Sequence, residues 1–261
     1  MAEAVPVFTT TPPRVRKIEL DRPWSWLAAG WRDLRRAPQV SLAYGVVFAL
    51  AGYAITLGLW WLGLVYLILP MMCGFLIVGP LLAVGLYEVS RRLEAGEPVS
   101  LGAALMAWRR NGSQIGLMGI VLLLLLFAWV RLAALLFMLF FGLEPPSVAH
   151  LFAQTFLNPD ALPFLIVGTV IGGALAALAF AISAISIPFL LDRPESNVFT
   201  AIATSVTAVR ENPATMLFWA VLVAGFSAAG LITLYLGLIV ILPLIGHATW
   251  HAYRDLVEHG S

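Results

Sequence analysis

Long apolar runs without any charged residue dominate the chain, and short polar segments separate them. Positions 37–87 hold 51 residues without charge, positions 161–191 hold 31, and positions 212–253 hold 42. A further run, from about 115 to 141, carries Arg131 as its one charge. Because a membrane-crossing helix needs about 20 apolar residues, the first and last runs each predict two spans and the other two predict one each. The pattern therefore predicts six transmembrane helices.

Turn signals divide the two longest runs. In the first, the break is expected at "WWLG", Trp60 to Gly63, because paired tryptophans suit the headgroup interface. In the last run, the turn is expected between Gly225 and Gly237. The outer segment 142–162 between spans three and four has helical apolar spacing between prolines and predicts a short surface helix.

Three polar-basic segments precede the odd-numbered spans and resemble one another. They read "WSWLAAGWRDLRRAPQ" (24–39), "VSLGAALMAWRRNGSQ" (99–114) and "NVFTAIATSVTAVRENPA" (197–214). In each, apolar residues stand one, four and eight positions before an arginine, and proline or glycine follows within three; the arginines are Arg35, Arg109 and Arg210. This spacing predicts amphipathic helices lying in the membrane interface.

The even-numbered spans share a proline before their polar end: Pro80, Pro188 and Pro243. Together with the three basic segments, this indicates three related units of interfacial helix plus helical hairpin, at about 24–95, 99–192 and 197–257. The sequence thus predicts an all-α, polytopic membrane domain over 21–261, preceded by a disordered cytoplasmic tail at 1–20.

Composition supports this picture. The chain is 61% hydrophobic and 11% charged, against about 25% charged in a soluble domain, so its surface must face lipid. A net charge of +1 without a basic patch argues against nucleic acid as a partner. Lysine and arginine gather in the N-terminal segment and in alternate links, so we expect both termini to be cytoplasmic in a bacterial inner membrane.

Candidate chemistry centres on "PLIGHATWHAYRDL", positions 243–256, where His247 and His251 share one helix face. They are candidate metal ligands, with Glu88 as a third, because the same count from the repeat proline reaches Glu88 and His251. Haem binding and a proton relay are alternatives. The structural interpretation is that these residues are the polar end of a membrane helix.

Arg131 is the other candidate functional residue, because a charge inside a span usually faces the protein interior or a wet cavity. It also has structural alternatives, such as snorkelling to phosphate. Gly168 and Gly172 form a small-xxx-small pair that favours close helix packing, within the chain or in a dimer.

The stretch "LPLIGHATWHAYRDLV" resembles a family of predicted bacterial integral membrane proteins catalogued as domain of unknown function 2189. The similarity rests on Leu242, Pro243, Gly246, His247, Ala248, Trp250, His251, Tyr253 and Arg254. It extends to "WLAAGWRDL" and "GPLLAVGLYEVSRRLE", and so over most of 24–257. The resemblance implies a multi-span inner-membrane protein, sometimes labelled as related to a cytochrome oxidase subunit, and it supplies no catalytic residues.

Motifs of common enzymes are missing: there is no GxxxxGK[ST], GxSxG or HExxH. We therefore expect a non-catalytic accessory, assembly or scaffold factor without a cofactor, whose partners are membrane lipids and another membrane protein complex. A transporter or channel for a small or lipidic substrate is the alternative, and a metal- or haem-binding redox subunit is the third hypothesis.

Overall fold

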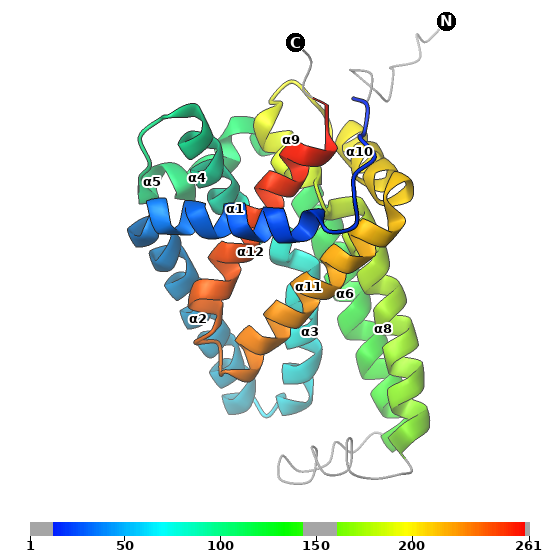
Figure 1. Cartoon of the computed structure of the whole chain (residues 1–261). Helices are drawn as coiled ribbons and strands as arrows, with labels where there is room; N and C mark the ends of the chain where they lie inside the picture. The colour runs from blue at the N-terminus through cyan, green and yellow to red at the C-terminus, as the bar shows by residue number, and fades with distance from the viewer. Residues whose placement is uncertain (1–12, 143–160, 259–261) are drawn as a thin grey trace, which may run out of the picture.

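The computed structural model describes residues 13–142 and 161–258, and helices make up most of that part (Figure 1). The first half contains α1 Arg22–Arg36, α2 Pro38–Trp61, η1 Val65–Leu67, α3 Ile68–Leu82, α4 Val84–Ala95, α5 Leu101–Leu105, η2 Ala107–Asn111 and α6 Gly112–Phe141. The second half contains α8 Leu162–Ser183, α9 Ser186–Asp192, α10 Val198–Glu211, α11 Pro213–Ile232 and α12 Leu238–Leu256. The short helix expected in segment 142–162 falls almost wholly outside the described residues.

Five stretches of the described residues are long and apolar enough to cross a membrane: Pro38–Trp61, Val65–Ala95, Ala107–Phe141, Leu162–Asp192 and Pro213–Ile232. The expected sixth span corresponds to α12, which does not meet the same measure. Its first half is apolar, but its second half, from His247 onward, carries histidine, arginine and aspartate. The prediction of six spans is therefore not confirmed by length and composition.

Both expected turns lie where the sequence places them. Helix α2 ends at Trp61, and Gly63 follows with a positive φ of 72°. The second turn joins α11 to α12 at residues 233–237, within the expected range. There Leu234 and Tyr235 adopt positive φ values of 53° and 66°, which are uncommon for residues with a side chain. The Tyr235 hydroxyl lies 2.6 Å from Thr56 Oγ1 of α2, which ties this turn to α2.

The three predicted units differ from one another in detail. The first and third interfacial segments form the single helices α1 and α10, whereas the second forms the short α5 and the 3₁₀ helix η2. The tighter turn lets Asn111 donate to the carbonyl oxygens of Leu190 and Ser196 at 3.3 and 3.0 Å, so tertiary contacts override the helical pattern. The chain also breaks between α3 and α4 and between α8 and α9, but α12 continues through Pro243. The triplication stays a prediction.

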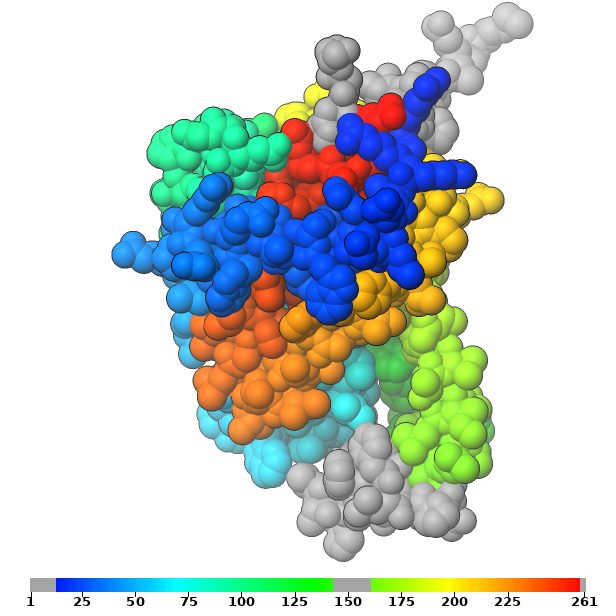
Figure 2. All heavy atoms as spheres, viewed as in Figure 1, coloured from blue at the N-terminus to red at the C-terminus, as the bar shows by residue number. Residues whose placement is uncertain are grey.

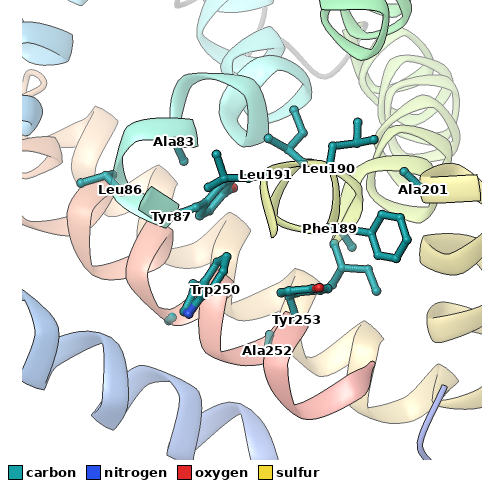
Figure 3. Packing of buried hydrophobic residues seen from close by; sticks show 14 of the residues in the cluster. Ala83, Leu86, Tyr87, Phe189, Leu190, Leu191, Ala201, Trp250, Ala252 and Tyr253 are labelled. Atoms are coloured by element: carbon teal, nitrogen blue, oxygen red, sulfur yellow. The ribbon is translucent and has the colours of Figure 1, made fainter. Parts of the chain in front are cut away.

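One end of the molecule is a polar cap built on α12. Helix α1 lies across α12 at this end, and α4, α5, α9 and α10 lie at the same end of the molecule (Figure 1). The cap also holds much of the buried core. Figure 3 shows Trp250 and Tyr253 of α12 packed beside Phe189 of α9 and Tyr87 of α4. The rings of Trp250 and Tyr253 are 5.5 Å apart, and those of Phe189 and Tyr253 are 6.2 Å apart.

The two described ends of the chain lie side by side. Val15 and Val257 form an antiparallel bridge, and the Arg16 amide donates to the Leu256 carbonyl oxygen at 2.8 Å. The Ile18 amide donates to Asn212 Oδ1 at 2.9 Å. Within the expected tail at 1–20, Arg14, Val15 and Arg16 thus contact the C-terminal segment and Ile18 contacts Asn212, whereas residues 1–12 lie outside the described part.

Candidate functional site

The polar side chains of the second half of α12 contact four neighbouring helices, α1, α2, α4 and α9. We call His247, Trp250, His251, Tyr253, Arg254 and Asp255 the α12 hub. The indole of Trp250 donates to Glu94 of α4 at 2.9 Å, and Tyr253 donates to Asp192 of α9 at 2.7 Å. Asp255 accepts two hydrogen bonds from Arg22 of α1 at 2.7 and 2.8 Å. The hub therefore fixes the cap around α12.

His247 is fully buried, and both of its ring nitrogens have partners. Nε2 lies 2.9 Å from Oγ of Ser41 on α2, and Nδ1 lies 2.8 Å from Oγ of Ser90 on α4. All three side chains are 0% exposed. His247 thus joins three helices through hydrogen bonds sealed from solvent, where an unmade bond would be costly.

The network continues to a buried carboxylate. His251 Nε2 lies 2.7 Å from Oδ2 of Asp33 on α1. Ser90, which contacts His247, also helps to lower the pKa of Asp33. We call Ser41, His247, Ser90, Asp33 and His251 the buried relay.

The three candidate metal ligands are not brought to one point. His247 and His251 belong to the buried relay, whereas Glu88 binds Arg91 and Arg92 at 2.8 and 2.7 Å and lies 3.9 Å from Arg110. Within residues 13–142 and 161–258, no group of three or more His, Cys, Asp or Glu side chains is placed to hold a metal. The two histidines contact serine and aspartate side chains of the same chain, and the metal assignment stays a prediction.

Two cap carboxylates have pKa values below their usual range. Burial alone would raise the pKa of Asp33, but hydrogen bonds from His251 and Ser90 outweigh it and lower that pKa. Burial likewise opposes the lowering for Asp255, where hydrogen bonds from Arg22 and Trp26 prevail. Both groups therefore favour the charged form in the folded protein.

We expect the cap to lose stability as the pH falls. Since the pKa values of Asp33 and Asp255 are lower in the folded than in the unfolded chain, their contribution is complete above the ordinary value of 3.8 and is lost as the pH falls through the folded values. The melting temperature should therefore decrease as the pH drops below about 4. Asp33→Asn should flatten that fall when melting is followed against pH, and an unchanged profile would contradict this assignment.

Arg131 does not face the protein interior. It lies in the middle of α6 and is exposed, so the expectation of a buried charge or a polar cavity around it is not supported. A long arginine on a lipid-facing surface can extend toward the headgroups, which was the structural alternative.

The two glycines of α8 have different surroundings. A Cβ added at Gly172 would lie 2.8 Å from the ring of Trp129 on α6, so this glycine permits close packing within the chain. A Cβ added at Gly168 would meet nothing within 4 Å. Only one member of the small-xxx-small pair therefore serves a contact between described helices.

The histidines' partners in the buried relay have only weak signals in the sequence. Asp33 stands in an amphipathic segment, and Ser41 and Ser90 are small hydroxyl residues near apolar runs. A buried acid on the apolar side of α1 was the available signal, since Asp33 is spaced three residues from Gly30 and seven from Trp26. Serine is too common in membrane helices to have stood out.

A separate feature is an apolar pocket of about 570 Å³ among α3, α8, α11 and α12. Figure 2 shows the surface hollowed between α11, in orange, and α8, in lime. Its walls include Phe75, Ile77, Gly173, Ala177, Ala220 and Ile241. Hydroxyl side chains line the end near the cap, where Tyr87, Ser183 and Thr249 lie, and Ser227 lies toward the other end. This pocket was not foreseen from the sequence.

The middle of the chain is similar to a known protein family. Residues 68–192 match the model of a family described as predicted integral membrane protein (DUF2189). The match includes "GPLLAVGLYEVSRRLE" but not the α12 hub, although the resemblance to this family also rests on residues of that hub. No curated protein and no solved structure matches the chain.

Proposed function

We propose, from the match of residues 68–192 to the model of a family of predicted integral membrane proteins (DUF2189), that the chain is a non-catalytic, multi-pass protein of the bacterial inner membrane. It acts as an accessory, assembly or scaffold factor through its contacts with lipids and with other membrane proteins. Both termini face the cytoplasm, and α12 completes a sixth crossing.

The proposal rests on one observation: the polar side chains of the cap form contacts with other residues of the same chain. The buried relay and the α12 hub join α1, α2, α4 and α9 through intramolecular contacts. The titratable groups that the sequence singled out at positions 88, 247 and 251 all have protein partners. What the molecule offers to its surroundings is its apolar flank and the pocket between α8 and α11.

The pairing of the two chain ends supports six crossings. Arg14 and Val15 lie against Val257 and Glu258, so the two ends share one side of the membrane. A chain whose ends share a side crosses an even number of times. Five stretches have the length and composition of a membrane span. Helix α12 is then the sixth crossing, because its apolar half, 238–246, leads from the turn at 233–237 back to the cap.

Reporter fusions test the topology. A fluorescent protein fused after Glu258 should fluoresce in a bacterial host, and alkaline phosphatase fused after Gly142 should be active. Phosphatase activity from a fusion after Glu258 would contradict both the orientation and the even count. The same phosphatase fused after Pro98, in the link between α4 and α5, provides the inactive control.

Purification tests the functional class. The protein extracted with its surrounding lipid in polymer nanodiscs should be colourless and free of stoichiometric metal, and it should retain lipids or a defined membrane partner. A haem spectrum or one bound metal per chain would instead favour the redox-subunit hypothesis. The lipidic-substrate alternative has one observation in its favour, the apolar pocket, which opens on the side of the molecule.

A further inference from the structure

We infer that the pocket among α3, α8, α11 and α12 binds one acyl chain of a membrane phospholipid, with the headgroup phosphate at Arg210. The inference rests on the proposed membrane placement and adds a ligand and a site to it. Three of the four walls, α3, α8 and α11, belong to candidate membrane spans, so the pocket opens at the depth of lipid hydrocarbon.

The size and lining of the pocket select the occupant. About 570 Å³ is within the usual range of about 300–1,000 Å³ for small-molecule sites. Water does not fill an apolar hollow of this kind, and an empty one loses the dispersion contacts of its walls. The molecule that surrounds such a wall in a bilayer is the lipid acyl chain. Gly173 leaves open space at the wall of α8, where an added Cβ would meet nothing within 4 Å.

The two ends of the pocket differ in polarity, which orients the lipid. Tyr87, Ser183 and Thr249 stand at the cap end. Tyr87 is 1% exposed, and its hydroxyl forms no hydrogen bond with any residue in the described ranges. It is available to an ester or glycerol oxygen, whereas the apolar remainder of the lining suits the chain.

Charge complementarity places the phosphate. Val209 and Pro213 line the cap end, and Arg210 stands between them in the last turn of α10. Arg210 is exposed and forms no ion pair with any residue that the structure describes, unlike its neighbour Glu211, which pairs with Lys17. An exposed arginine beside the mouth of an apolar pocket suits a lipid phosphate.

The test compares two glycine variants on one helix. We would compare the wild type with Gly173→Phe and Gly168→Phe. Each protein is reconstituted in vesicles of phosphatidylethanolamine and phosphatidylglycerol and then extracted in detergent. Native mass spectrometry measures the mass of the extracted protein with its bound lipid. Gly168→Phe is the control: Gly168 lies on the same helix and also has open space around it, but it does not line the pocket. Wild type and Gly168→Phe should retain one phospholipid per chain, and Gly173→Phe should lose it.

Arg210→Ala separates the headgroup from the chain. It should release the retained phospholipid at lower activation energy in the mass spectrometer, while leaving the melting temperature unchanged. Melting of both phenylalanine variants checks that they fold. Retention of the lipid by Gly173→Phe, or a wild type that carries none, would overturn the inference, as would a dimer mass that Gly173→Phe abolishes. The fusion experiment remains independent, so loss of the site would leave the proposed topology intact.

Discussion

Gly30→Ala should prevent the cap from assembling. A Cβ at this position would lie 2.7 Å from the backbone nitrogen of Ala248 and 2.8 Å from the carbonyl oxygen of Leu244. Neither atom can move without displacing α12, so α1 would have to separate from it, together with Trp26 and Asp33. We expect the free energy of unfolding to decrease by about 3 kcal/mol or more, at the upper end of overpacking effects.

The matched control is Gly58→Ala on α2, where an added Cβ would meet nothing within 4 Å. This change should leave stability unchanged or raise it by up to about 1 kcal/mol, since alanine favours a helix over glycine. The stability of both variants is measured by heating them in detergent and recording the fraction of protein that stays monodisperse. Equal melting of the two would show that α1 and α12 do not approach as closely as the structure has them.

His247→Leu should destabilise the protein by about 3 kcal/mol, because it leaves the buried hydroxyls of Ser41 and Ser90 without the ring nitrogens that they contact. Leucine nearly fills the space, so the loss reports hydrogen bonding more than volume. Adding Ser41→Ala to this variant should recover part of the loss, since the orphaned hydroxyl is then gone. Thermal unfolding of the single and double variants gives the coupling energy between His247 and Ser41.

The same experiment separates the relay from a metal site. A zinc or nickel ion bound by the histidines would raise the melting temperature of the wild type in proportion to its concentration over its dissociation constant. We expect no such rise. Stabilisation of the wild type by zinc, abolished in His247→Leu, would overturn the structural assignment of this histidine.

Several local features could be read from the sequence because their causes are local. The turn at Trp60 to Gly63 follows from glycine's tolerance of positive φ, which Gly63 uses. The amphipathic helices α1 and α10 lie close to their expected bounds, since period and breakers act over a few residues. The second segment departed from its pattern because Asn111 bonds to carbonyl oxygens about 80 residues away.

By itself, the sequence determined that this is a helical membrane protein, because 61% hydrophobic composition and long uncharged runs have no other stable environment. It also marked "PLIGHATWHAYRDL" as unusual. Only the tertiary structure decided what that stretch does. Hydrogen-bond partners such as Ser41, Ser90 and Asp33 are distant in the chain, and which of them meet His247 and His251 depends on how α1, α2 and α4 pack on α12. The apolar pocket, likewise, exists only because α8 and α11 stand apart.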